Sequence, residues 1–152
     1  MNRDEPLFGY LALLGVYGGT FGSLLYLGAK RGVLPRRVVP YDIALLGLAT
    51  HQLARIVTRD KVIEPLRAPF AEVEGPAGAG EVKSRARGQG LRKAIGTLVT
   101  CPYCVGPWVA AVLFTGLVAR PRATRLVASV FAAAALSDFA HQAWAFARRA
   151  SD

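Results

Sequence analysis

Long uncharged stretches constrain the fold of this chain more than any other feature of its sequence. No charged residue occurs between Leu7 and Gly28. A helix of that length, rising about 1.5 Å per residue, crosses the apolar core of a bilayer, which is about 30 Å thick. Apolar residues make up 53% of the chain, and its mean hydropathy is +0.32, which exceeds the apolar content of an ordinary soluble domain. The sequence therefore predicts an all-α, polytopic membrane protein.

The charged residues gather in short clusters that divide the chain into four apolar segments. We expect a single membrane domain over residues 1–152, with about four transmembrane helices. Proline residues should break or kink the third helix near its start, at Pro102 and Pro107. The predicted spans are residues 7–28, 41–58, 98–119 and 126–147.

Residues 59–93 form the one long polar segment between the predicted spans. The first part, KVIEPLRAPF, mixes apolar and charged residues with two prolines, which predicts a short amphipathic element lying on the membrane surface. The second part is rich in glycine, alanine and charge, which predicts a flexible polar loop.

The net charge of +9 comes from 19 basic and 10 acidic residues. The basic residues flank apolar runs, as at Arg148 and Arg149, which suits anchoring to lipid headgroups rather than a nucleic-acid-binding face. We therefore expect the lipid bilayer, and no nucleic acid, as a partner. More basic residues lie on the side that holds both termini and residues 59–93, which predicts that this side faces the cytosol.

Polar side chains interrupt the second and fourth predicted spans. Such groups are costly within a bilayer, so they should face the bundle interior or pair with one another. Asp42 lies in the second span, and Arg55 and Asp138 can form an intramembrane ion pair between the second and fourth spans.

The two cysteines and two histidines of the chain fall at similar predicted depths in three different spans. Two thiolates and two imidazoles are a common tetrahedral set for zinc and can also hold iron. The predicted metal ligands are therefore Cys101, Cys104, His51 and His141. Two other interpretations stay open: a redox-active Cys101–Cys104 dithiol, because a C-x-x-C pair at a helix start favours the thiolate, and a purely structural polar cluster.

Glycines of the first span are spaced four residues apart, which lets another helix approach closely. This small-residue face either packs within the bundle or forms an interface with a second copy or another subunit. Its residues are Gly15, Gly18, Gly19 and Gly22.

The segments LATHQLARIVTRDKVIEPLRAPF and GTLVTCPYCVGPWVA resemble a bacterial membrane-protein family known as domain of unknown function 1360. The resemblance covers about Leu46–Ala110. It implies a small integral membrane protein, in a family with a sporulation-associated member in bacilli, and it supplies no activity. The residues that match the family motif are Arg55, Asp60, Pro65, Arg67, Pro69, Phe70, Cys101, Cys104, Gly106 and Trp108.

These patterns favour a non-enzymatic subunit or scaffold of a membrane complex, either as a homo-oligomer or within a larger assembly. A Cys/His cluster in it could hold a structural zinc or iron. The first alternative is a membrane thiol-disulfide oxidoreductase that uses the CPYC dithiol. The second is a small transporter or channel accessory with a polar path through Arg55, Asp138 and His141.

Overall fold

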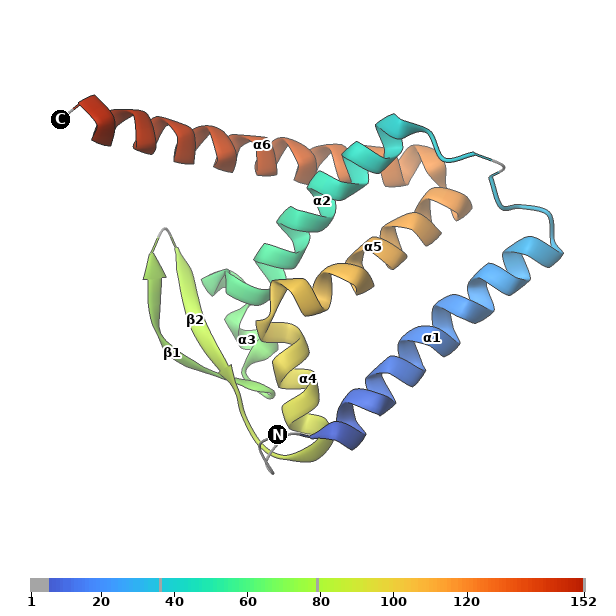
Figure 1. Cartoon of the computed structure of the whole chain (residues 1–152), viewed down its shortest axis with the longest axis horizontal. Coiled ribbons are helices and arrows are strands. Elements are labelled where there is room, and N and C mark those ends of the chain that lie inside the picture. Colours follow the sequence, from blue (N-terminus) through green and yellow to red (C-terminus); the bar gives the residue numbers. More distant parts are fainter. Residues whose placement is uncertain (1–5, 36, 79, 152) are drawn as a thin grey trace.

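The structure is a computed structural model that describes residues 6–35, 37–78 and 80–151. The chain is mostly helical, with one small sheet (Figure 1). The long helices are α1 (Leu7–Lys30), α2 (Pro40–Arg59), α4 (Gly90–Thr100), α5 (Pro102–Ala119) and α6 (Pro121–Ser151). Between α2 and α4 lie a short 3-10 helix, η1 (Lys61–Ile63), the one-turn helix α3 (Glu64–Arg67), and the strands β1 (Ala71–Gly78) and β2 (Glu81–Ala86).

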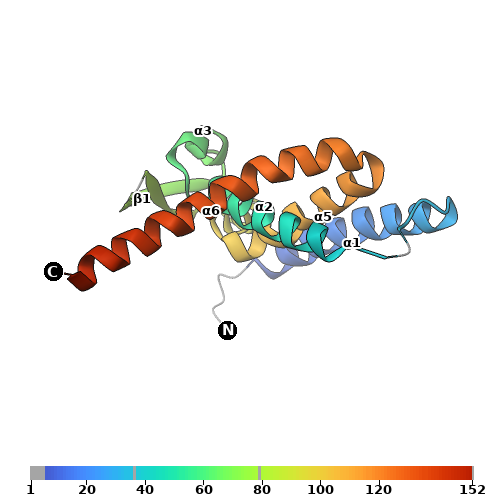
Figure 2. The same ribbon diagram turned by 90° about the horizontal axis from the view of Figure 1, so that it is seen from above.

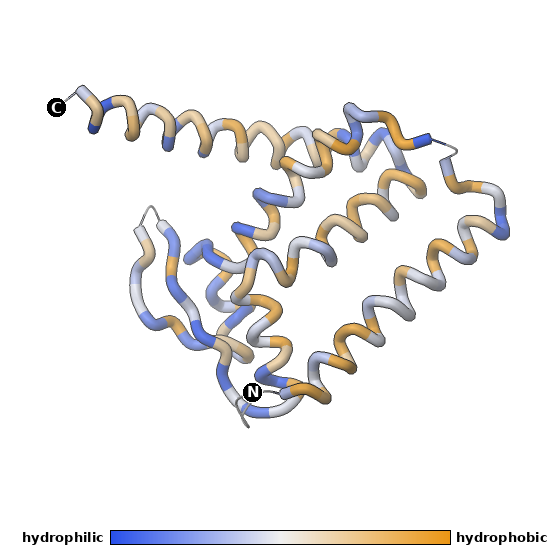
Figure 3. The backbone as a smooth tube through the Cα atoms, viewed as in Figure 1, coloured by the Kyte–Doolittle hydropathy of each residue, from blue (hydrophilic) through white to orange (hydrophobic). Residues whose placement is uncertain are grey.

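Among the described residues, three helices are long and apolar enough to cross a membrane: α1, α5 and α6. Three of the four predicted spans therefore fall on helices that could cross a membrane by their length and composition. The predicted second span falls on α2, which is helical over its whole length but has no 18-residue stretch as apolar as those of the other three. Figure 3 shows the apolar residues concentrated on the long helices, and the hydrophilic residues on the hairpin and on α3.

The connections between the long helices gather at two opposite ends of the bundle. The connection between α1 and α2 and the turn between α5 and α6 lie at one end of the bundle (Figure 1). The N-terminal end of α1, the C-terminal end of α2, helix α4 and the β1–β2 hairpin gather at the opposite end. We call this the hairpin end. Helix α6 crosses α2 and then continues past it (Figures 1 and 2).

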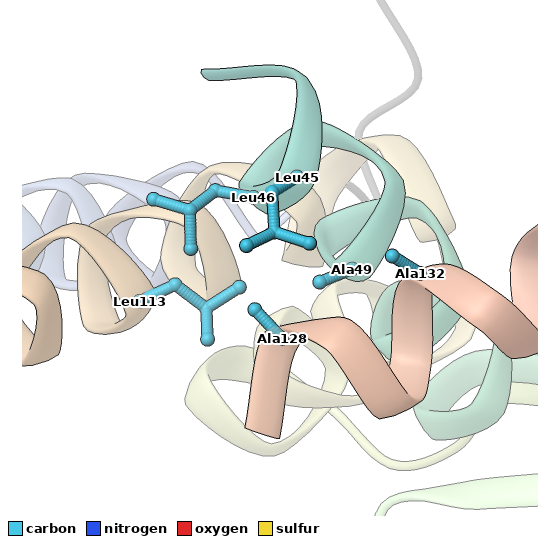
Figure 4. Close-up of a cluster of buried hydrophobic side chains, with 6 residues drawn as sticks. All are labelled: Leu45, Leu46, Ala49, Leu113, Ala128 and Ala132. Carbon is cyan, nitrogen blue, oxygen red and sulfur yellow. The ribbon is translucent and has the colours of Figure 1, made fainter. Parts of the chain in front are cut away.

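The buried core lies where α2 packs between α5 and α6. Leucines of α2 contact Leu113 of α5, and small residues of α6 let the helices approach closely. Figure 4 shows this cluster, which consists of Leu45, Leu46, Ala49, Leu113, Ala128 and Ala132. Because neighbouring helices cover it, α2 also buries the polar side chains of Asp42, Gln52 and Thr58.

The predicted third span, 98–119, is interrupted in the structure. Helix α4 ends at Thr100, Cys101 is extended with φ −114° and ψ 111°, and α5 begins at Pro102. A residue that precedes proline avoids the helical region, whereas proline itself suits the first position of a helix. The expected break at Pro102 is thus present, and residues 98–100 belong to a separate helix.

The prediction of an all-α fold with a flexible polar loop is wrong for residues 71–86. These residues form an antiparallel hairpin with partners Ala71 and Ala86 at its base and Gly78 and Glu81 at its tip. Gly78 and Gly80 have φ values of +92° and +80°, a conformation that glycine adopts without steric cost. The glycines that suggested a loop instead supply the reversal of the hairpin.

Candidate functional site

Arg55 joins three elements at the hairpin end of the bundle. Its guanidinium, on α2, donates one hydrogen bond to Asp138 of α6 and another, 2.6 Å from Nε to Oε1, to Glu81 of β2. Arg59 adds a weaker contact, 3.7 Å from its NH1 nitrogen to Oε2 of Glu81. The structure therefore brings together the predicted Arg55–Asp138 pair. Glu81 was not predicted, because its element was expected to be a loop.

Asp42 forms a second ion pair at the opposite end of the bundle. Its two carboxylate oxygens accept hydrogen bonds of 2.8 Å from Nε and NH2 of Arg125 on α6. The Asp42 side chain is 5% exposed and the Arg125 side chain is 45% exposed. Bidentate geometry of this kind is among the stronger ion-pair arrangements. Helix α6 is thus tied to α2 by one charged contact towards each end of α2.

Arg67 explains the P-L-R-x-P-F part of the sequence motif. It is buried, and it donates hydrogen bonds of 3.1 and 2.9 Å to the carbonyl oxygens of Val57 and Asp60 at the end of α2. The Val57 carbonyl lies in the last turn of α2, where helical donors run out, and the Asp60 carbonyl also accepts a 3.3 Å hydrogen bond from the N–H of Ile63. The guanidinium therefore caps the end of α2 and ties it to η1. Burial lowers the pKa of the Arg67 guanidinium, and the nearby Glu64 and Asp60 oppose this effect.

The CPYC segment forms the first turn of α5. Cys101 is the N-cap residue and Cys104 lies in the first turn, with its N–H donating a 3.0 Å hydrogen bond to the Cys101 carbonyl oxygen. Both cysteines are unbridged, Cys104 is exposed, and the two thiols interact with each other. Two adjacent thiols at a helix start can form a disulfide or bind a thiophilic ion.

The two histidines do not join the cysteines. The His51 ring stacks on Phe139 of α6, with ring centroids 5.3 Å apart, and His141 is exposed on α6. Within residues 6–35, 37–78 and 80–151, no group of three His, Cys, Asp or Glu side chains is placed to hold one metal ion. The four-ligand zinc or iron site is therefore not assembled within a single chain of this fold.

The glycine face of α1 has no neighbour among the residues that the structure describes. A methyl group added at Gly15, Gly18, Gly19 or Gly22 would meet nothing within 4 Å. By contrast, a methyl group at Gly9 would lie 2.7 Å from the Ala94 side chain of α4. Helix α1 is thus attached to α4 near its N-terminal end and to Trp108 of α5 through the rings of Tyr17 and Phe21, while its glycine face remains open.

Comparisons with known proteins agree with the motif. The family model described as a protein of unknown function (DUF1360) matches residues 45–144, a range that includes Arg55, Glu81, Cys101, Cys104 and Asp138. The sporulation protein YjcA of Bacillus subtilis (strain 168) is 34% identical over 98 residues, which are 62% of this chain and 83% of that protein. No solved structure matches the chain.

Proposed function

This chain belongs to the DUF1360 family, and from that premise we propose that it is a non-enzymatic subunit of a complex in the bacterial cytoplasmic membrane. It assembles through the glycine face of α1, either with a second copy or with another subunit. The observation that carries the proposal is the exposure of α1, which is long and apolar enough to span a membrane yet has no residue of its apolar window buried.

The proposed topology has four spans, with α2 as the fourth. Helix α2 has the length of a span, and α5 and α6 cover the face that holds its core leucines. Its ionisable residues Asp42 and Arg55 are paired with residues of α6, which lowers the cost of placing them in a bilayer.

In this topology the hairpin end faces the cytosol, because the basic residues of the hairpin and α4 lie there. The apolar side chains of Val62 and Leu66 are 87% and 75% exposed. They are four residues apart at the same end of the bundle, which suits an element resting on the membrane surface. The C-terminal turn of α6 carries Arg148 and Arg149, which supports placing the C-terminus on the same side.

Substitutions on the glycine face of α1 test this proposal. Replacing Gly18 and Gly22 together by leucine adds bulk where a neighbouring helix would pack, so the complex extracted from native membranes should lose mass. The control is Gly47→Leu, since Gly47 of α2 is also exposed and has nothing within 4 Å. The measurement is light scattering coupled to size exclusion. A wild-type chain that is monomeric, or a double variant of unchanged mass, would refute the proposal.

A second candidate function is thiol-disulfide exchange, favoured by the placement of Cys101 and Cys104 at the start of α5. In such an enzyme one thiol attacks a partner disulfide and the other resolves the mixed disulfide. Cys104→Ser should then trap a mixed disulfide through Cys101, visible on a non-reducing gel. The absence of any trapped species would argue against it. A transport path has no comparable support, because Arg55 and Asp138 neutralise each other.

A further inference from the structure

A groove of about 330 Å³ lies between α2 and α6. Its floor includes the buried side chains of Leu45 and Ala132, and its rim includes Tyr41 and Leu136, which are 63% and 57% exposed. Apart from the hydroxyl groups of Tyr41 and Ser129, the side chains that line the groove are apolar. Because α6 is long and apolar enough to cross a membrane, the groove opens to lipid in the proposed four-span topology.

Two arginines of α6 lie at the mouth of this groove, next to the turn between α5 and α6 (Figure 1). Arg122, Arg125 and Ser129 are spaced three and four residues apart, so they share the face of α6 that lines the groove. Nε and NH2 of Arg125 hold Asp42, which leaves the NH1 group for another acceptor. Tyr41 also interacts with Arg125, so the rim of α2 lies close to the same guanidinium.

The guanidinium of Arg122 carries a charge that nothing at this mouth balances. Arg122 is exposed, and within the described residues it forms no hydrogen bond or ion pair, whereas Arg125 is paired with Asp42. The surrounding segments, residues 29–41 and 119–126, contain no acidic residue. Their basic residues are Lys30, Arg31, Arg36, Arg37, Arg120, Arg122 and Arg125. This end of the bundle therefore favours an anionic ligand over a neutral one.

We propose that the groove binds an acyl chain of an anionic phospholipid, whose phosphate group is held by Arg122. NH1 of Arg125 and the hydroxyl of Tyr41 are the further donors to the headgroup. Guanidinium groups bind phosphate oxygens strongly, and basic residues beside a cleft between membrane helices are a recurrent site for anionic headgroups. The inference goes beyond assembly through the glycine face of α1, and it rests on the proposed placement of α2 in the bilayer.

A phospholipid matches both parts of this site, whereas other anions match only one. Inorganic phosphate could bind the guanidinium of Arg122, but it would leave the groove empty. An acidic peptide could bind the basic residues at the surface, but it would not enter a groove between two membrane helices. An anionic lipid combines a negative headgroup with an apolar chain, in the order in which the arginines and the groove follow one another along α6.

The test uses the purified full-length chain in detergent, with lipid binding measured by native mass spectrometry. The probes are dioleoylphosphatidylglycerol, which is anionic, and dioleoylphosphatidylcholine, which has the same acyl chains and no net charge. We expect one phosphatidylglycerol molecule per chain, bound about tenfold more tightly than phosphatidylcholine, in line with the strength of a hydrogen bond to a charged group. Equal affinity for the two lipids would overturn the proposal.

Two pairs of variants locate the site. Arg122→Gln should remove most of the preference for phosphatidylglycerol, whereas Arg148→Gln, which removes the same charge from an exposed position in the last turn of α6, should keep it. Ala133→Phe should fill the groove and weaken the binding of both lipids, whereas Ala147→Phe, also exposed on α6, should weaken neither. Ala44→Phe, on the α2 wall of the groove, replaces Ala133→Phe if that variant fails to fold, as judged by circular dichroism. Equal effects in the variants and their controls would refute the site.

Two further measurements separate this proposal from its alternatives. Displacement of the bound lipid by equimolar inorganic phosphate would show that the site holds a free anion, and it would refute the lipid site. The chain with Gly18 and Gly22 replaced by leucine should keep its preference for phosphatidylglycerol, because the glycine face does not line the groove. Failure of the complex and failure of the lipid site are therefore distinct results.

Discussion

Gly96 of α4 lies against the base of the hairpin, so Gly96→Ala should destabilise the protein although alanine is the better helix former. A methyl group at this position would overlap the Phe70 carbonyl oxygen and lie 3.0 Å from the Ala86 side chain. The Phe70 carbonyl cannot swing away freely, because it accepts a 2.9 Å hydrogen bond from the N–H of Arg87. The clash is therefore with fixed backbone rather than with a flexible side chain.

The magnitude follows from a comparison with Gly47→Ala on α2, where the added methyl group meets nothing within 4 Å. Both substitutions gain about 1 kcal/mol of helix propensity. Only Gly96→Ala adds the cost of overpacking, which is about 1–3 kcal/mol. The two variants should differ by about 2 kcal/mol in free energy of unfolding, which corresponds to about 6 °C in Tm for a chain of this size.

The assay is thermal unfolding followed by circular dichroism, with both variants in the same detergent and at the same heating rate. Backbone hydrogen exchange should place the loss at the base of the hairpin, where the amide of Arg87 becomes less protected. A Tm for Gly96→Ala equal to or above that of Gly47→Ala would refute the close approach of α4 to the hairpin.

Three further predictions concern the charged contacts. Glu81→Gln removes the ion pair between the hairpin and α2, so trypsin should cleave after Lys83 about tenfold faster, in line with the strength of a hydrogen bond to a charged group. Arg125→Met should lower the Tm more than Asp42→Asn, because it leaves a buried carboxylate unpaired, whereas the half-exposed arginine can turn to water; equal losses would contradict this asymmetry. Arg67→Met should cost about 3 kcal/mol in free energy of unfolding, measured by chemical denaturation, because it uncaps α2.

The positions of the long helices can be predicted from local properties of the sequence. Apolar length predicts α1, α5 and α6, and the effect of Pro102 on the preceding residue predicts the break at Cys101. The pairing of Arg55 with Asp138 could also be anticipated, because a buried charge on one span requires an opposite charge on another.

The predicted Cys/His metal site depended on depth along the helix axes alone. Depth along a helix axis places Cys101, His51 and His141 in one layer, but it does not state which way each side chain points. In the structure α6 crosses α2 so that Asp138 meets Arg55, while His51 turns to Phe139. Similar depth therefore does not bring the histidines to the cysteines.

The hairpin escaped prediction for a different reason. Its strands contain few of the β-branched and aromatic residues that mark strands. Its position is set by contacts with distant residues, namely Glu81 with Arg55 and Ala86 with Gly96. Tertiary packing of this kind leaves no local pattern in the sequence.

The polar character of α2 has a consequence for biogenesis. A helix with Asp42 and Arg55 is a poor substrate for insertion on its own, because each charge disfavours partition into the bilayer. Its partners Arg125 and Asp138 belong to α6, which is synthesised well after α2. In the proposed four-span topology, the two charges of α2 therefore have no partners until α6 has been synthesised, so α2 enters the bilayer together with α6 rather than on its own.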